Sequence, residues 1–172
     1  MTLRTSARVH VQPVTPALAD AVRALRVAPA QLDYVGEAAF NLADTQRDPL
    51  SEAMAVLADD SVIGFYRLDF APNAIVGRGL GAPSVGLRAF LLDIRQQGRG
   101  YGARAALALC DDLRVRHPQR RLLVLAVNCR NRAAIATWRK AGFVDTGELL
   151  GGGRAGPQHL MLRGLGAPGV GH

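Results

Sequence analysis

The 172-residue sequence is poor in the residues that mark metal sites, disulfide frameworks and membrane spans. Its two cysteines, Cys110 and Cys129, do not have CxxC spacing, and its four histidines are scattered, so we expect neither a bound metal nor a disulfide framework. No apolar run reaches the roughly 18 residues that a membrane-spanning helix needs. The first 16 residues lack the apolar core of a signal peptide. We therefore expect a soluble cytoplasmic protein without a membrane partner.

Lysine is almost absent, because Lys140 is the only lysine among 21 basic residues. The formal net charge of +7 is typical of proteins that bind nucleic acid, but the nine aromatic residues do not alternate with the arginines as base-stacking residues would. We interpret the arginine excess as a consequence of codon composition and expect no nucleic-acid partner. Between Arg95 and Lys140, eleven basic residues stand against two acidic ones. This uneven distribution also fits a small polyanionic ligand near the C-terminal half.

Apolar residues are plentiful by contrast and make up 49% of the chain, which is enough for a sizeable core. The length favours one domain, which we expect over residues 1–164, followed by a flexible Gly/Pro-rich tail over residues 165–172. Periodicity predicts strands over residues 8–14, 53–58, 62–70, 85–94, 122–127, 143–150 and 158–162. It also predicts four helical regions. One begins at Thr15-Pro16, one or two short helices lie within residues 29–43, one follows the fourth strand and ends at about Arg116, and one covers residues 131–141.

The order of these elements predicts the fold class. The strands before and after Asp59-Asp60-Ser61 form a hairpin, whereas later strands are connected through helices. The helix that ends at Arg116 has four apolar residues that we expect on one buried side, namely Ala106, Leu107, Cys110 and Leu113. Hairpins followed by crossover units predict an α/β fold, or α+β on a stricter definition. Its mixed central sheet would have six to seven strands, with helices on both faces.

The strongest local signal is the segment Gln97–Gly102, which we call the glycine loop and which reads Gln-Gly-Arg-Gly-Tyr-Gly. It lies between a buried strand and a helix, where glycines permit a tight turn and free N–H groups favour anions. With Arg99 and Arg104 nearby, it predicts a phosphate or pyrophosphate site, and a ligand-free turn is the alternative. The glycines lack the GxGxxG spacing of a Rossmann fingerprint, and the P-loop motif is absent.

Two segments resemble the GNAT superfamily of acyl-CoA N-acyltransferases. Gln97-x-x-Gly100-x-Gly102 is similar to the family signature Q/R-x-x-G-x-G/A. Asn131-x-x-Ala134-Ile135-x-x-Trp138-x-Lys140-x-Gly142-Phe143 is similar to the family segment N-x-x-A-I-x-x-Y-x-K-x-G-F. The similarity extends over about residues 8–163, and the order of elements is that of the family. Short stretches around Gln31, Ile63 and Glu148 resemble the bacterial spermine/spermidine acetyltransferase branch.

This resemblance implies that acetyl-CoA is the co-substrate and that a splay between the fourth and fifth strands admits its pantetheine arm. The end of the fourth strand would pair with the arm like an added strand, and the N–H of Leu92 would polarise the thioester carbonyl. Asn131 would bind the arm and also cap the helix that follows it. The residues implied in cofactor binding are Phe90, Leu91, Leu92, Gln97, Gly98, Arg99, Gly100, Tyr101, Gly102, Ala103, Arg104, Asn131 and Trp138.

Two departures from the family pattern concern the acceptor and its proton. Many relatives have a carboxylate in the fourth strand that takes the proton of the amine, but this chain has Arg88 there. Glu37 is an alternative base, and Asp93 is either a second one or a solvated turn carboxylate. We expect Tyr34, Glu37 and Arg88 to contact the acceptor.

The second departure is Trp138, which stands where the family usually has a tyrosine acid. Tryptophan offers an N–H but cannot usefully give up a proton. Tyr34, Tyr66 and Cys129 are possible substitutes. Because a thiol has a pKa near 8.5 and leaves without much help, loss of the acid should slow the reaction rather than abolish it. The expected catalytic residues are Leu92, Trp138 and Glu37.

Together these features predict a bacterial, acetyl-CoA-dependent N-acetyltransferase that acts on a primary amine of a small molecule by direct attack on the thioester. A protein or peptide N-acetyltransferase and a catalytically weak CoA-binding module are the alternatives. The net charge and Arg88 favour a monoamine, or an amine that also bears a carboxylate, over spermine. A homodimer is compatible with the sequence.

Overall fold

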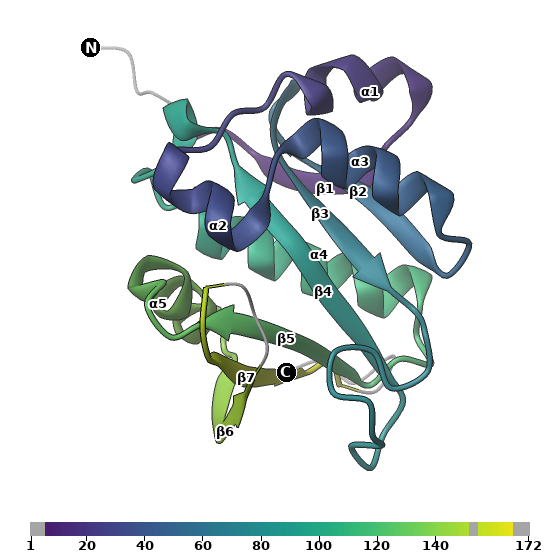
Figure 1. The fold of residues 1–172 in the computed structure, drawn as a ribbon. Helices are drawn as coiled ribbons and strands as arrows, with labels where there is room; N and C mark the ends of the chain where they lie inside the picture. Colours follow the sequence, from purple (N-terminus) through teal and green to yellow (C-terminus); the bar gives the residue numbers. More distant parts are fainter. Residues whose placement is uncertain (1–5, 152–154, 167–172) are drawn as a thin grey trace.

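Seven strands form one mixed sheet in the order β1-β2-β3-β4-β5-β7-β6 in the computed structural model, which describes residues 6–151 and 155–166 (Figure 1). All neighbours are antiparallel except β4 and β5, which are parallel. The strands are β1 Val9–Pro13, β2 Ser51–Ala58, β3 Ser61–Asp69, β4 Ser84–Leu92, β5 Leu122–Asn128, β6 Val144–Leu150 and β7 Gln158–Gly164. The predicted mixed sheet and the β2–β3 hairpin are confirmed.

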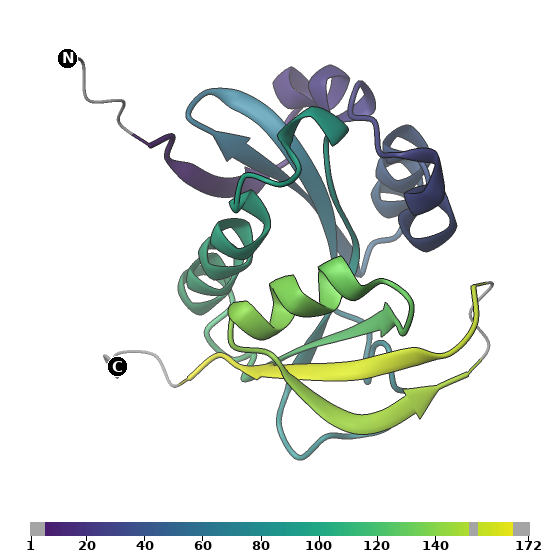
Figure 2. The same cartoon turned by 90° about the vertical axis from the view of Figure 1, so that its left-hand side faces the viewer.

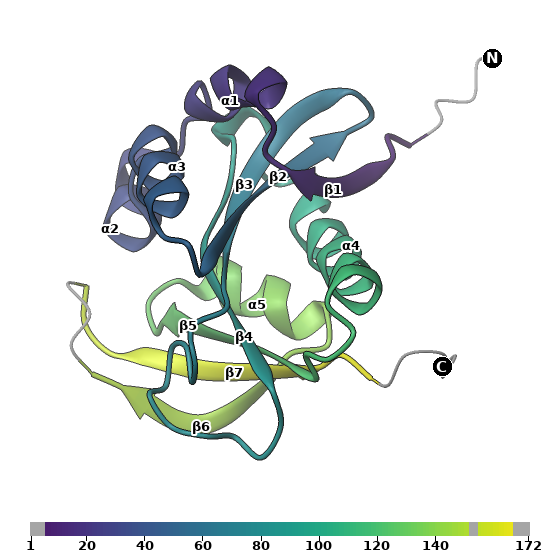
Figure 3. The same cartoon turned by 90° about the vertical axis from the view of Figure 1, so that its right-hand side faces the viewer.

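Helices cover both faces of this sheet (Figure 3). They are α1 Pro16–Arg23, α2 Leu32–Val35, α3 Ala38–Arg47, α4 Tyr101–Arg116 and α5 Arg132–Lys140, with short 3-10 turns at Pro29–Gln31 (η1) and Ile94–Gln96 (η2). α1, α2 and α3 lie on one face. On the other face α4 and α5 lie side by side (Figure 2).

The two faces of the sheet bury separate apolar cores, because side chains alternate along each strand. Met54 and Val56 of β2 pack with the α4–α5 side, together with Leu109 and Trp138. The intervening residues of β2 point to the opposite face, where Ala55 and Leu57 pack with Val22 of α1 and Leu42 of α3. The central strands are therefore buried on both sides, as their apolar sequences predict.

Helix α4 is the longest helix in the described part of the chain and has one buried stripe. This stripe is Ala105, Ala106, Leu109, Cys110 and Leu113. Leu107 was expected on it, but its side chain is exposed. The prediction was wrong because at 3.6 residues per turn Leu109, and not Leu107, falls in line with Ala106 and Leu113. The helix ends at Arg116, before His117-Pro118, as predicted.

The pairing of β4 with β5 is short, so the two strands separate over the rest of their length. Only Ser84–Gly86 pairs with Leu122–Val124, and beyond these residues the two strands diverge (Figure 1). β4 also contains a bulge, because its register with β3 shifts between Phe65 and Arg67 and Ala89 has a φ of 52°. The splay implied between the fourth and fifth strands is therefore present. β4 ends at Leu92 rather than at the predicted Ile94, because Asp93 caps the turn η2.

The C-terminal strands follow the prediction with one difference at the end of the chain. Gly142 follows α5 with a φ of 92°, a conformation that favours glycine after a helix. The predicted glycine turn at 151–153 and the tail at 165–172 fall mostly outside the described residues. Leu165 is described and is fully buried, with its N–H bonded to Arg121, so the packed chain extends past residue 164. Among the described helices, none has the length and apolar character to cross a membrane.

Candidate functional site

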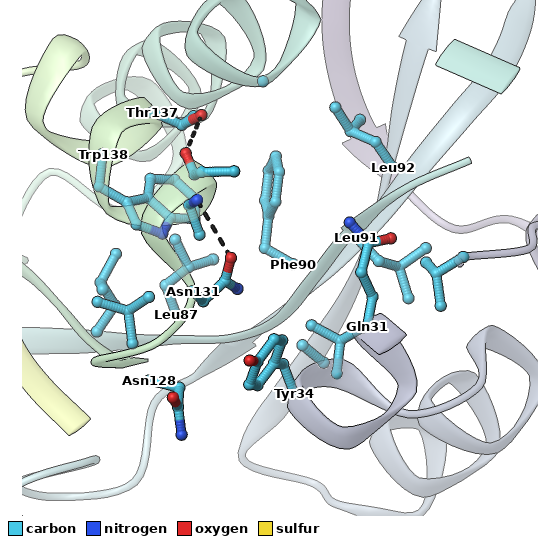
Figure 4. Close-up of a pocket in the computed structure, with 18 of the residues that line it drawn as sticks. Gln31, Tyr34, Leu87, Phe90, Leu91, Leu92, Asn128, Asn131, Thr137 and Trp138 are labelled. Carbon is cyan, nitrogen blue, oxygen red and sulfur yellow. Dashed lines mark hydrogen bonds between the residues drawn. The ribbon is translucent and has the colours of Figure 1, made fainter. Parts of the chain in front are cut away.

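The diverging strands β4 and β5 enclose a cleft of about 660 Å³ (Figure 4). One wall is the end of β4 from Leu87 to Leu92, and the other is the end of β5 with the first turns of α5. The glycine loop closes one end of the cleft, and α2 contributes Asp33, Tyr34 and Val35. The cleft therefore brings together segments that are more than a hundred residues apart in the sequence.

The glycine loop has the conformation that its glycines permit. Gly98 and Gly100 have φ angles of 75° and 78°, and Gly100 is the N-cap of α4. A Cβ atom built at either position would meet nothing within 4 Å, so open space lies beside the loop. Gly102 differs, because a Cβ there would lie 3.1 Å from Cγ2 of Thr137 on α5. Gly102 thus permits close packing of α4 on α5, whereas Gly98 and Gly100 leave room beside the helix N-terminus, where an anion is favoured.

The two arginines expected to reinforce this loop do not line the cleft. Arg99 is exposed and absent from the cleft walls. Arg104 directs its guanidinium toward the segment before β1, where it bonds to Oγ of Ser6 at 3.2 Å and to the carbonyl of Ala7. Because Arg104 lies in the first turn of α4 on the side facing β1, its side chain stabilises the N-terminal segment. The expected charge contribution of these two side chains to the cleft is therefore not seen.

Leu92 has its backbone turned toward the cleft. The N–H of the next residue, Asp93, bonds to the carbonyl of Ile63 on β3 at 2.8 Å. Backbone groups alternate in direction along an antiparallel strand, so the N–H and carbonyl of Leu92 point away from β3. The carbonyl accepts a hydrogen bond of 3.0 Å from Nε2 of Gln97. The N–H of Leu92 is consequently on the edge of β4 that faces the splay.

Asp93 is not a solvated turn carboxylate, because its side chain is only 3% exposed. It accepts hydrogen bonds from the N–H of Arg26 and from both the N–H and Nε of Arg95. Burial alone would raise the pKa of Asp93, but these hydrogen bonds outweigh burial and lower the pKa below its ordinary value. Asp93 does not line the cleft. It joins the segment that follows α1 to the turn η2, so its contacts give it a structural role.

Trp138 and Asn131 both line the cleft from α5 (Figure 4). The indole ring of Trp138 is 5% exposed and packs edge-to-face on Phe90 of β4, with ring centroids 4.9 Å apart, and on Phe143 at 5.3 Å. Trp138 thus belongs to the wall between the two strands. Asn131 caps α5, with its side-chain oxygen accepting from the N–H of Ala134 at 3.3 Å. Asn131 therefore both lines the cleft and caps α5.

Arg88 of β4 and Tyr34 of α2 also line the cleft. The guanidinium of Arg88 bonds through Nε to Oδ2 of Asp69 at 2.8 Å, and its side chain is 44% exposed. Asp69 itself is buried, and its other oxygen accepts from the N–H of Ala71. Asp69 was not singled out in the sequence, because its partner across the sheet depends on the bulge in β4.

Three expected candidates are not brought into the cleft. Glu37 stands at the N-cap position of α3 without a side-chain capping bond and lines a separate small pocket, so the side chain expected to be a catalytic base is placed outside the cleft. Tyr66 is fully buried in the core, and burial raises its pKa well above the usual range. Cys129 follows β5 but does not line the cleft. Helix periodicity could not place Glu37, because the chain direction changes at Gly36.

The comparison with known proteins agrees with this geometry. No curated protein matches the sequence. Among solved structures, the chain is similar to the aminoglycoside acetyltransferase AAC(6')-Ib in complex with coenzyme A and kanamycin, with 17% identity, a TM-score of 0.69 and 91% and 95% of the two chains covered. It is similar to an aminoglycoside N(6')-acetyltransferase from Legionella pneumophila, with 12% identity, a TM-score of 0.71 and 94% of each chain covered.

A third similar structure is spermidine N-acetyltransferase from Vibrio cholerae in complex with CoA and spermine, with 15% identity, a TM-score of 0.68 and 91% and 95% of the chains covered. At these identities the likeness shows the fold alone. The family model described as "Acetyltransferase (GNAT) family" matches residues 19–143, which span the glycine loop, both walls of the cleft and Trp138. The chain therefore belongs to the GNAT family of acetyltransferases.

Proposed function

We propose that the protein transfers the acetyl group of acetyl-CoA to a primary amine of a small molecule, by direct attack of the amine on the thioester. The observation that carries this proposal is the cleft itself, in which the glycine loop at the start of α4 and the cleft-facing N–H of Leu92 share one cavity. Acetyl-CoA supplies an acetyl group that is activated as a thioester. The bond from nitrogen to the acetyl carbon forms, the carbon–sulfur bond breaks, and the amine loses one proton.

The residues present fit the anionic end of acetyl-CoA. N–H groups in the first turn of α4 have no partner within the helix, and the helix dipole adds positive potential there. The open space at Gly98 and Gly100 lets a pyrophosphate approach the backbone closely. We assign this role to the backbone of the glycine loop, since the side chains of Arg99 and Arg104 lie elsewhere.

The free edge of β4 holds the pantetheine arm in this proposal. Beyond Gly86 this edge has no pairing with β5, so an extended ligand can add to it as a further strand. Asn131 reaches the same space from α5. The N–H of Leu92 then donates to the thioester carbonyl and stabilises the negative charge that develops on its oxygen, and one such donor is typically worth about 3 kcal/mol.

Trp138 shapes the wall beside the reacting groups rather than supplying a proton. Its ring is held by Phe90 and Phe143, so its position is well defined. It excludes water from the end of β4 and leaves the thiolate to depart unaided, which the ordinary thiol pKa near 8.5 permits.

The proton of the amine has few acceptors in the described part of the cleft. Asp33 is the one carboxylate among the described lining residues, and Arg88 and Lys140 are the other charged side chains there. An alkylamine with a pKa near 10 must lose its proton before it attacks. We therefore propose that the amine reacts from its small neutral fraction and that its proton leaves through water, with no carboxylate on β4.

A free-thiol release assay tests the proposed function. Acetyl-CoA is incubated with the protein and with separate panels of monoamines, amino acids, polyamines, aminoglycosides and peptides. Thiol release that depends on a free amine supports the proposal. Release with peptides alone would indicate a peptide N-acetyltransferase. Binding of CoA without release from any panel would indicate a CoA-binding module and would contradict the proposed function.

A further inference from the structure

The charged side chains of the cleft determine which charge on the acceptor amine is favoured. Among its described lining residues, Asp33 stands against Arg88 and Lys140. Other carboxylates of the early helices do not compensate, because Asp44 and Asp48 both bind the guanidinium of Arg67, at 2.8 and 2.7 Å. Glu37 faces a different pocket. An acceptor with several positive charges would thus find one lining carboxylate, Asp33, because the charge of Asp69 is already paired with Arg88, and Lys140 would oppose its binding.

Arg88 is held by Asp69 through Nε alone, which leaves its two terminal nitrogens available to a ligand. Asp69 engages Nε, and within the described residues no hydrogen bond is made by the two terminal nitrogens. Asp69 is fixed in turn, because its side chain is 9% exposed and its second oxygen bonds to the N–H of Ala71. The terminal nitrogens of an arginine present two parallel N–H groups that match the two oxygens of a carboxylate. The ion pair with Asp69 orients this fork before any ligand arrives.

An apolar side chain, Ile75, lies near the Asp69–Arg88 pair. Ile75 lines the cleft, although its φ of 75° is rare for a β-branched residue. Gly86 on β4 permits this placement, because a Cβ atom there would lie 3.1 Å from Cγ1 of Ile75 and 3.3 Å from Cβ of Asp69. The same contacts fix Ile75 next to the Asp69–Arg88 pair. A ligand at this end of the cleft therefore meets an apolar surface and a guanidinium together.

We propose that Arg88 binds a carboxylate of the acceptor, so that the substrate is an amine that also carries a carboxylate on an apolar stem. This inference rests on the proposed function, because it uses the N–H of Leu92 to mark where the amine reacts. Arg88 and Leu92 lie opposite Arg67 and Gly64 of β3, so with the bulge between them they are about three strand residues apart, or roughly 10 Å at about 3.3 Å per residue. The ion pair with Asp69, which lies opposite Gly86 in the sheet, directs the Arg88 side chain toward Gly86 and away from Leu92, so several bonds separate the amine from the carboxylate.

Three matched series of acceptors test the proposal. The first runs from glycine to 6-aminohexanoate, the second contains the alkylamines of the same lengths, and the third contains the corresponding diamines. We expect at least one ω-amino carboxylate to have a kcat/KM about tenfold or more above both the alkylamine and the diamine of its length, which is the range of a charge-assisted hydrogen-bonded pair. A diamine or alkylamine that equals or exceeds its carboxylate partner at every length would overturn the proposal.

Arg88 variants assign the preference to this residue. Arg88→Gln should reduce the ratio of kcat/KM for the best ω-amino carboxylate to kcat/KM for the matched alkylamine about tenfold or more. Arg88→Lys keeps the charge without the fork and should retain part of the preference. Arg23→Gln is the control, because Arg23 pairs with Asp20 outside the cleft and its loss changes the net charge equally. An unchanged carboxylate preference in a folded Arg88→Gln protein would place the recognition elsewhere and contradict the proposal.

A binding measurement separates this inference from the proposed function. The CoA-loaded protein is titrated with 5-acetamidopentanoate and with N-pentylacetamide, which differ in the carboxylate but need no turnover. We expect the carboxylate to bind at least tenfold more tightly, and this advantage to disappear in Arg88→Gln. Equal binding, or no binding of the carboxylate, overturns the role of Arg88 even if amines are acetylated. Preferential binding without any thiol release supports the carboxylate site and contradicts only the proposed transfer.

Discussion

The side-chain amides of Gln31 and Gln97 bond to each other in both directions. Nε2 of Gln31 donates to Oε1 of Gln97 at 3.1 Å, and Nε2 of Gln97 donates to Oε1 of Gln31 at 2.9 Å (Figure 4 shows Gln31). Nε2 of Gln97 also bonds to the carbonyl of Leu92. The turn before α2 is thereby joined to the glycine loop and to the strand edge that faces the cleft.

Removal of this pair should weaken CoA binding without unfolding the protein. Each partly buried hydrogen bond contributes about 0.5–1.5 kcal/mol, so Gln31→Ala and Gln97→Ala should each raise the CoA dissociation constant about two- to tenfold. The double variant should show less than the sum of the two effects, because both substitutions break the same contact. Calorimetric titration measures the constants, and Gln46→Ala on the exposed side of α3 is the control. Strictly additive effects would argue against a shared role.

Substitution of Gly100 tests the glycine loop as the site for the pyrophosphate. CoA should raise the melting temperature of the wild-type protein, because a ligand that binds the native state stabilises it. Gly100→Asp places a carboxylate beside the start of α4 and should abolish this rise.

Gly100→Asn is the matched control for Gly100→Asp, since asparagine tolerates the φ of 78° about as well as aspartate and adds no charge. It should retain part of the rise. A full rise in a folded Gly100→Asp protein would show that CoA binds elsewhere.

Substitutions of Trp138 test whether this side chain forms part of the CoA-binding wall of the cleft. Trp138→Tyr should keep or raise turnover, because it introduces a hydroxyl acid while keeping an aromatic contact with Phe90. Trp138→Ala should weaken CoA binding, and the cavity that it leaves should reduce the free energy of unfolding by about 3–5 kcal/mol. A turnover assay measures the first effect, titration with CoA measures the change in affinity, and chemical denaturation measures the change in the free energy of unfolding. If the alanine variant retains both turnover and CoA affinity, Trp138 is not part of the site.

Asp93 makes a pH-dependent contribution to stability. Its pKa is lowered in the folded protein, so its carboxylate stabilises the fold above the ordinary pKa of about 3.9, and this stabilisation is lost as the pH falls through the folded pKa. Asp93→Asn should therefore lower the melting temperature at pH 7, and the difference from wild type should shrink below pH 4. Asp20→Asn, on the exposed face of α1, should show little difference at either pH. A constant difference between Asp93→Asn and wild type from pH 7 to pH 3 would contradict this assignment.

The parts of the site that depend on the backbone could be predicted from the sequence. The glycines at 98, 100 and 102 and the strand before them are local signals, and Trp138 follows from the spacing along α5. These residues line the cleft as expected.

Side-chain partners across elements could not be predicted in the same way. Arg104 turns to Ala7, and Asp93 becomes buried against Arg26, because packing of the N-terminal segment and α1 decides their surroundings. The pairing of Arg88 with Asp69 depends on the register of β3 and β4, which the bulge at Ala89 shifts. No periodicity in the sequence marks that bulge.

The most direct test of the proposed acetyl transfer is to quantify both products of one reaction. The protein is incubated with acetyl-CoA and the best acceptor of the ω-amino carboxylate series, and the free thiol and the N-acetylated amine are measured by thiol titration and mass spectrometry. We expect equal amounts of the two products in the wild type and neither product in Gly100→Asp. Thiol release without an acetylated amine, or equal activity in Gly100→Asp, would contradict it.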